Sequence, residues 1–122
     1  MEQELSNDAF VFAEDGRVWW PLVVNVPTDG GKTEEKRPEV LITVPTVPKL
    51  QELEKADDPI AALLTLVHDW RNIAVAKGKT DKSTPLKFTK ANFMAVCGLP
   101  FFLAALRRAL RETAAGAEAK NS

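Results

Sequence analysis

Alternating apolar and polar residues predict two β-strands in the first third of the chain. The first strand, residues 17–26, has one wholly apolar face. Every second residue belongs to it: Val18, Trp20, Leu22, Val24 and Val26. The second strand, residues 37–44, repeats the pattern at Val40, Ile42 and Val44. A turn-rich segment at residues 27–32 separates the two, so the pattern predicts an antiparallel ribbon with a long, flexible connection.

Two further features concern how this ribbon is completed. Asp15-Gly16 has the composition of a tight turn, and it predicts a short hairpin between residues 9–13 and the strand that begins at Arg17. Pro21 cannot donate a backbone hydrogen bond, which favours an edge position for the first strand. Because a two-stranded ribbon is marginal in water by itself, it must pack on helices or on another subunit.

Apolar residues at three- and four-residue spacing predict two helices in the middle of the chain. The first spans residues 46–55 and starts at Thr46 and Pro48. Asp58 and Pro59 suit the cap and first position of the second, which runs to Trp70. Its apolar stripe consists of Ile60, Leu63, Leu64, Val67 and Trp70. Residues 72–85 are expected to form a loop.

Two more helices follow this loop. Thr89 caps a short helix that ends at Gly98, and Phe88 and Phe93 can form a hydrophobic staple across its start. Pro100 opens the last helix. Its apolar face consists of Phe102, Leu103, Leu106 and Leu110. The predicted fold class is therefore α+β, with an N-terminal antiparallel β-ribbon followed by a bundle of about four short α-helices.

Length and composition predict a single domain. With 122 residues, of which 45% are hydrophobic, the chain can bury one modest core. We expect a flexible arm at residues 1–9, one α+β domain at 10–113 (ribbon 10–45, helices 46–113), and a flexible tail at 114–122. The polar N-terminus is unlike a signal peptide, and the longest uncharged run, residues 93–106, is shorter than a membrane helix. A soluble cytoplasmic protein without membrane contact is therefore expected.

Few residues offer catalytic or ligand chemistry. Cys97 is the only cysteine, and its apolar surroundings predict a small buried hydrophobe rather than a nucleophile. His68 and Asp69 are neighbours on the predicted second helix, where adjacent side chains do not face each other. One His and one Cys need several carboxylates to make a zinc site, and no glycine-rich loop opens a helix. We expect no catalytic residue, no metal and no cofactor.

The charge distribution predicts no nucleic-acid partner. The net charge of −1 gives no overall attraction to DNA. Arg107, Arg108 and Arg111 come late in the last helix, where cations suit the helix dipole. A run of cations after Trp70 surrounds the single acid Asp81 and is interpreted as a solvated loop or, alternatively, as a contact for an acidic partner. It contains Arg71, Lys77, Lys79, Lys82, Lys87 and Lys90.

Apolar side chains outside the predicted core indicate a partner-binding surface. Trp19 and Val23 have the opposite parity to the apolar face of the first strand, and Leu41 has the corresponding parity on the second. Phe101 lies off the apolar face of the last helix. Exposed apolar and aromatic side chains mark partner sites in small domains. The alternative is that the helix at residues 89–96 covers Phe101 and a turn covers Trp19, and the sequence leaves both interpretations open.

A series of short motifs extends over most of residues 10–113. The C-terminal half combines Trp70 at a predicted helix end, Pro85-Leu86-Lys87-Phe88-Thr89, Asn92-Phe93, Leu99-Pro100, Ala104-Ala105-Leu106 and Ala109. The N-terminal half adds the strand at residues 18–27 and Asp29-Gly30-Gly31-Lys32. Together these motifs resemble the tail assembly chaperones of long-tailed (siphovirus-type) bacteriophages and prophages. The loop at residues 74–83 departs from the family pattern, since it is lysine-rich and lacks an acidic Asp-Gly piece.

The resemblance implies a non-enzymatic role in the cytoplasm of a bacterial host. Such chaperones bind the phage tape measure protein, keep it soluble, help tail tube subunits gather around it, and are absent from the mature virion. In many phages a programmed frameshift adds a C-terminal domain, to which residues 114–122 would be a linker. The two-faced ribbon also suggests self-association. The alternatives are a small tail-completion or connector subunit that stays in the virion, then a small DNA-binding regulator, and last an enzyme.

Overall fold

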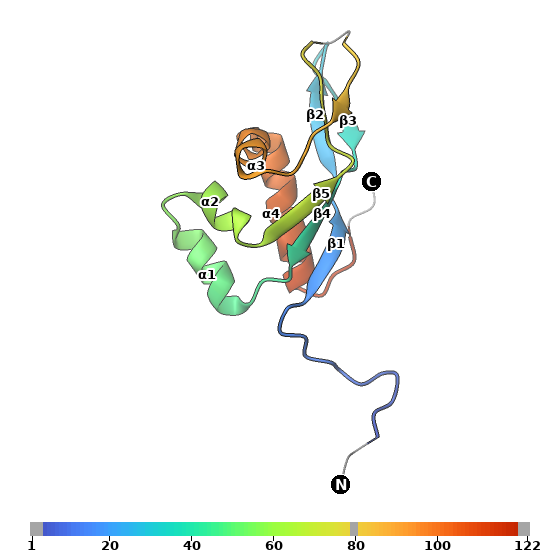
Figure 1. Ribbon diagram of the computed structural model, residues 1–122, viewed down its shortest axis with the longest axis vertical. Coiled ribbons are helices and arrows are strands. Elements are labelled where there is room, and N and C mark those ends of the chain that lie inside the picture. The colour runs from blue at the N-terminus through green and yellow to red at the C-terminus, as the bar shows by residue number, and fades with distance from the viewer. Residues whose placement is uncertain (1–3, 79–80, 120–122) are drawn as a thin grey trace.

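An antiparallel sheet backed by helices forms the body of the protein in a computed structural model, which describes residues 4–78 and 81–119 (Figure 1). The sheet has the order β1 (Arg17–Pro21), β4 (Glu39–Thr43) and β5 (Val67–Arg71). Strands β2 (Val24–Thr28) and β3 (Lys32–Lys36) pair as a hairpin. The helices are α1 (Val47–Lys55), α2 (Pro59–Leu64), α3 (Lys90–Cys97) and α4 (Pro100–Ala114). The α+β fold class predicted from the sequence is confirmed.

The predicted antiparallel ribbon is present, with its apolar face turned towards the helices. Val18 stands opposite Ile42, and Trp20 opposite Val40. Leu22, Val24, Val40 and Ile42 are buried, and Val18, Trp20 and Val26 pack against them. Val44 departs from the expectation. It is 36% exposed because β4 ends at Thr43, one residue before it.

The ribbon is longer and more regular at its tip than the sequence suggested. The predicted strand at residues 17–26 divides into β1 and β2, and the Leu22 N–H donates to the Pro38 carbonyl (2.8 Å) where the two meet. The expected flexible connection is wrong, because β3 and the end of β2 occupy most of it. Gly30 and Gly31 have φ values of 82° and 73°, a left-handed conformation that glycine adopts without strain and that closes tight hairpins.

The first strand of the sheet lies at an edge, as Pro21 indicated, but it has no hairpin partner from the N-terminus. Residues 9–13 form no strand, so that prediction is wrong. The reason lies at Gly16, whose carbonyl accepts a hydrogen bond from the Val44 N–H (3.1 Å). This bond ties the chain to the end of β4 instead of turning it back along β1.

Strand β5 is the largest difference from the sequence-based expectation. Residues 58–70 were expected to form one helix, but α2 ends at Leu64 and the chain then pairs with β4. Ile42 stands opposite Val67 and Leu41 opposite Asp69, so His68 is an extra residue, a β-bulge. Val67 and Trp70 are three residues apart and would face opposite sides of a regular strand. Because of the bulge, both side chains are buried on the same face of the sheet. Their three-residue separation is therefore the same as the spacing expected for a helix.

Side-chain caps start three of the four helices, as predicted. Thr46 accepts a hydrogen bond from the Lys49 N–H (3.3 Å), Asp58 from the Ala61 N–H (3.2 Å) and Thr89 from the Asn92 N–H (3.1 Å). These bonds satisfy backbone donors that have no partner within the first helical turn. The sequence therefore located these helix starts correctly, even where it misjudged how far the second helix runs.

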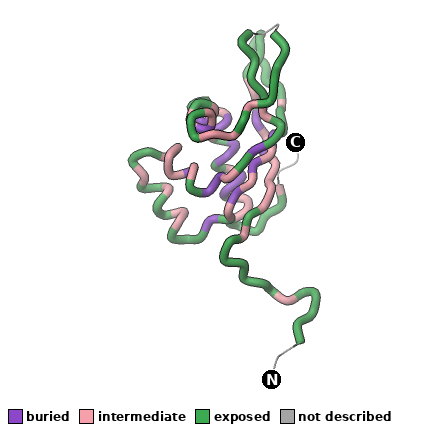
Figure 2. The backbone as a smooth tube through the Cα atoms, in the orientation of Figure 1, coloured by how far each residue is buried: buried purple, intermediate pink, exposed green. Residues whose placement is uncertain are grey.

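The core lies between the sheet and the helices (Figure 2). Trp70 packs against Phe88 and Phe93 with ring centroids 5.1 and 6.4 Å away, and its indole N–H donates to the Leu86 carbonyl (2.7 Å). Phe88 and Phe93 are 5.9 Å apart, so the predicted staple is present. Helix α4 supplies the other side of the core with Phe102, Ala105, Leu106, Ala109 and Leu110.

The remaining segments complete the chain. The expected loop at residues 72–85 contains a short ladder between β6 (Ala74–Val75) and β7 (Thr84–Pro85). Among the described residues, no single helix has the length and apolar character needed to span a membrane. Helices α3 and α4 reach that length and composition only when they are counted together, and a bend of 104° separates them. Residues 1–3 of the predicted arm and 120–122 of the predicted tail lie outside the described residues. The division into arm, domain and tail stays a prediction.

Candidate functional site

The sheet has one face that the helices do not pack against. Trp20, on β1, donates its indole N–H to Glu112 of α4 (3.0 Å), which fixes the helical side of the sheet. Adjacent residues of a strand point to opposite faces, so Trp19 points away from the helices. Leu41 shares this orientation because it stands directly opposite Trp19 in the β1–β4 pairing. We call the surface around Trp19 and Leu41 the open face.

Trp19 and Leu41 form the apolar centre of the open face. Both are half-buried, and among the described residues neither belongs to the core nor packs against it. On the other side of Leu41, strand β5 places Asp69 in the same row. Two large apolar side chains therefore lie next to each other on the sheet, with a carboxylate beside them.

Arg71 and Glu39 hold the Trp19 ring in place. The guanidinium of Arg71 donates two hydrogen bonds to Glu39. They run from Nε and Nη2 to the two carboxylate oxygens (3.2 Å each). The central carbon of the guanidinium lies 4.0 Å from the centroid of the Trp19 ring. A cation over an aromatic face is favourable, and a guanidinium fixed by a bidentate carboxylate is well ordered. The indole is thus exposed in part but oriented.

The other two predicted partner-binding residues lie apart from this pair. Val23 is half-buried at the junction between β1 and β2 and does not pack against the core. Phe101 lies in the first turn of α4, on the helical side of the sheet, and packs against the core. The structure therefore brings Trp19 and Leu41 together but does not bring Phe101 to the same surface.

His68 marks the end of the open face near the start of β1. Its Nε2 shares a hydrogen bond with the Thr43 hydroxyl (2.6 Å). Burial lowers the pKa of His68 below its usual value of 6.5, and the positive charge of Arg17 lowers it further, while Asp15 acts in the opposite direction. The neutral imidazole is therefore favoured.

The structure also shows the positions of the cysteine and histidine that the sequence analysis considered as catalytic or metal-binding residues. Cys97 is buried in α3, and burial raises the pKa of its thiol to about 12. Within residues 4–78 and 81–119, no group of three or more His, Cys, Asp and Glu side chains is arranged to hold a metal ion. The predicted His68–Asp69 neighbours lie on β5 rather than on a helix.

Sequence reasoning missed Arg71, Glu39 and Asp69 as parts of the open face. Glu39 shares the parity of Leu41, so strand periodicity contained that signal. Arg71 and Asp69 were hidden because their segment was expected to be helical. Recognising a strand at Val67–Arg71 would have placed both on the face of Leu41, through the bulge at His68.

Comparison of the chain with protein-family models, with curated proteins and with solved structures finds no match. The open face and the sequence motifs are therefore the features of the protein that bear on its function.

Proposed function

We propose that this protein is a bacteriophage tail assembly chaperone, a non-catalytic protein that binds the tape measure protein through the open face and promotes tail tube assembly around it. The observation that carries the proposal is the oriented pair Trp19 and Leu41 on a sheet face that none of the helices in the described residues packs against. The resemblance of the sequence motifs to this family supplies the class of partner. The site of action would be the cytoplasm of the bacterial host.

The size of the open face suits a helical partner. Three strands spaced about 4.8 Å apart make a surface about 10 Å wide. An α-helix with its side chains is also roughly 10 Å across. A tape measure protein, as expected for the family, is a long helical chain with exposed apolar stripes. One such stripe laid on Trp19 and Leu41 would be shielded from water and from other stripes.

The polar surroundings of the pair also suit a protein partner. Glu39, Asp69 and Arg71 lie around the apolar centre. An apolar centre with a polar rim is the usual composition of a specific interface, and Trp and Arg are the residues most often responsible for its affinity. Because Arg71 already orients the indole, little side-chain entropy would be lost on binding.

Co-expression with the tape measure protein of the same phage or prophage genome tests the proposal. The wild-type chain should keep the tape measure protein in the soluble fraction and co-purify with it. Trp19→Asp and Leu41→Asp should each reduce the soluble amount, because a buried carboxylate without a partner opposes the contact. Val75→Asp is the matched control, since Val75 is an exposed β-branched residue on β6, which pairs with β7 and not with the three-stranded sheet.

Folding of the variants must be checked, so that loss of binding is not mistaken for loss of structure. Trp19 and Leu41 lie outside the core, so the Asp variants should keep the circular dichroism and the cooperative thermal transition of the wild type. Trp19→Asp should melt slightly earlier, because it loses the contact with Arg71. If folded Trp19→Asp and Leu41→Asp variants hold the tape measure protein in solution as well as the wild type does, the open face is not its binding site.

Mass spectrometry of purified virions separates the chaperone from a small tail-completion or connector subunit. A chaperone should be missing from the finished particle. Stoichiometric recovery of this chain from virions would favour the structural subunit instead. A folded chain that neither binds the tape measure protein nor enters the virion would contradict both functions.

A further inference from the structure

The N-terminal segment carries large apolar side chains that touch almost nothing in its own chain. Residues 4–16 leave the sheet at the base of β1 and run away from the body (Figure 1). Phe10 is 90% exposed and Phe12 is 78% exposed. Exposed aromatics in one short stretch are unusual for a soluble domain and mark a contact surface. From here on, the arm means residues 4–16, a longer segment than the one expected from the sequence at residues 1–9.

The arm also carries acidic groups at both ends of its aromatic stretch. Phe10 and Phe12 lie between two turns, at residues 7–8 and 14–15. Asp8 and Glu14 belong to these turns, so one carboxylate precedes the two phenyl rings in the sequence and another follows them. No cation precedes Arg17 in the sequence, so the arm is acidic throughout. Its complement would be an apolar cleft with positive charge at the rim.

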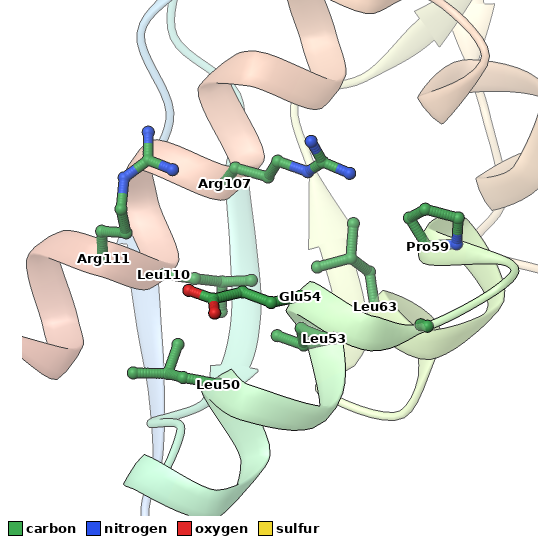
Figure 3. Close-up of a pocket in the computed structure, with 9 residues that line it drawn as sticks. Leu50, Leu53, Glu54, Pro59, Leu63, Arg107, Leu110 and Arg111 are labelled. Carbon is green, nitrogen blue, oxygen red and sulfur yellow. The ribbon is translucent and has the colours of Figure 1, made fainter.

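Such a cleft lies between α1 and α4 (Figure 3). It has a volume of about 250 Å³. Its apolar lining comes from residues of three helices and the segment between two of them: Leu50, Leu53, Ala56, Pro59, Leu63 and Leu110. Arg107 and Arg111 stand on the α4 wall and Glu54 on the α1 wall, so the cleft has a net positive charge.

The dimensions and charges of the cleft and the arm agree. An apolar cavity of about 150 Å³ can hold a benzene ring, so this cleft can take at least one phenyl ring of the arm. Neither Arg107 nor Arg111 makes an ion pair with another of the described residues. Either guanidinium is therefore available to Asp8 or Glu14, and a pair next to an apolar floor is screened less than one in water.

We infer that the arm of one copy docks in the cleft between α1 and α4 of a second copy, with Phe10 or Phe12 in the cleft and Asp8 or Glu14 on Arg107 and Arg111. A second copy is favoured as the source because the arm runs from the start of β1 away from α1 and α4 of its own chain (Figure 1). The six Cα–Cα steps from Phe10 to Gly16 span at most about 20 Å, enough to cross to a neighbour. Reciprocal exchange of two arms closes a dimer. This inference does not depend on the proposed function.

Light scattering or sedimentation of the full chain tests the inference. The wild type should have at least twice the monomer mass of 13.4 kDa. The double variant Phe10→Ser with Phe12→Ser should return to the monomer mass, about 13.4 kDa. The control Val75→Ser removes another exposed apolar side chain and should leave the mass unchanged. A monomeric wild type, or a dimer that survives the double substitution, overturns the inference.

A charge exchange tests the cleft itself. Arg107→Glu with Arg111→Glu should dissociate the dimer, and adding Asp8→Lys with Glu14→Lys should restore it. Arg108→Glu, on the same helix but outside the cleft, should have no such effect. Recovery of the dimer by the second pair of changes cannot come from a folding defect. If Asp8→Lys with Glu14→Lys fails to restore the dimer of a folded Arg107→Glu, Arg111→Glu variant, the arm does not bind in the cleft.

Cross-linking separates docking between copies from docking within one chain. A Val11→Cys variant and a Leu50→Cys variant, each monomer carrying one introduced thiol, should form a disulfide-linked dimer when mixed under oxidation. The pairing of Val11→Cys with Val75→Cys is the control and should not. The double variant Val11→Cys with Leu50→Cys carries both thiols in one chain. If it forms an intramolecular disulfide and no linked dimer, the arm docks in the cleft of its own chain, and the inference that a second copy supplies the arm is overturned.

Discussion

The guanidinium carbon of Arg71 lies 4.0 Å from the centroid of the Trp19 ring, although the two residues come from opposite edges of the sheet. The Arg71 side chain reaches across β4 to make this contact, and Glu39 of β4 holds it there through two hydrogen bonds of 3.2 Å. The contact links all three strands on the open face. It explains how a half-buried indole outside the core of a small domain can have a fixed orientation.

Replacement of Arg71 should loosen Trp19 without unfolding the protein. Arg71→Ala removes a partly exposed cation–π contact, and we expect it to lower the free energy of unfolding by about 0.5–1 kcal/mol. Indole fluorescence should become more accessible to a neutral quencher. Arg71→Lys keeps the charge but loses the planar, bidentate contact with Glu39, so it should resemble Arg71→Ala in quenching. Unchanged quenching in both variants would mean that Arg71 does not order the ring.

Trp70 should be far more important to stability than its hydrogen bond with one carbonyl suggests. Trp70→Phe leaves the Leu86 carbonyl without its indole donor and opens space beside Phe88 and Phe93. Loss of a hydrogen bond to a partly buried acceptor costs about 1 kcal/mol, and the space left beside the two rings adds to this. Urea denaturation should show a loss of at least this size. Trp20→Phe is the comparison, because the Trp20 side chain is only partly buried whereas Trp70 is 6% exposed, and its loss should be smaller.

Stability should fall as the pH drops below 6.5, in part through His68. Its pKa is lowered in the folded protein, chiefly by burial and then by Arg17. Below pH 6.5 the unfolded chain therefore binds a proton more readily than the folded chain, and protonation favours unfolding. The contribution of neutral His68 to the free energy of unfolding is fully present above pH 6.5. It is lost as the pH falls through the pKa of His68 in the folded protein. Urea titrations between pH 7.5 and 5.5 should show a smaller dependence on pH for His68→Gln. An identical dependence in both proteins would contradict this origin.

Cys97 should be unreactive in the native protein. Its pKa of about 12, raised by burial, makes the thiolate about a thousandfold scarcer at neutral pH than for a thiol with a pKa of 9.0. Native protein should react negligibly with a thiol reagent such as Ellman's reagent and fully after denaturation in urea. Rapid stoichiometric labelling of folded protein would show that the thiol is accessible.

The sequence predicted the parts of the fold whose signals are local. The caps at Thr46, Asp58 and Thr89 each depend on one side chain and a backbone amide three residues later, so composition is enough to find them. The core face of the ribbon could likewise be identified from alternation alone. Even the staple between Phe88 and Phe93 depends only on residues near one helix start.

Tertiary pairing decided the parts that the sequence did not predict. Val67 and Trp70 have helical spacing, and only the bulge at His68, formed against β4, explains why a strand buries both. The same error concealed half of the open face. Trp19 and Leu41 could be selected from parity, but their neighbour Arg71 could not, because its position depends on the pairing of a strand that local periodicity did not reveal.

Site-specific photo-cross-linking from position 41 tests the central claim most directly. A photoreactive amino acid replaces Leu41 in cells that also produce the tape measure protein, and the same replacement at Val75 is the control. Leu41 lies beside Trp19 at the centre of the open face, whereas Val75 lies on β6. We expect a cross-link to the tape measure protein from position 41 and none from position 75. A folded protein that gives no tape measure cross-link from position 41, or equal cross-links from both positions, would contradict it.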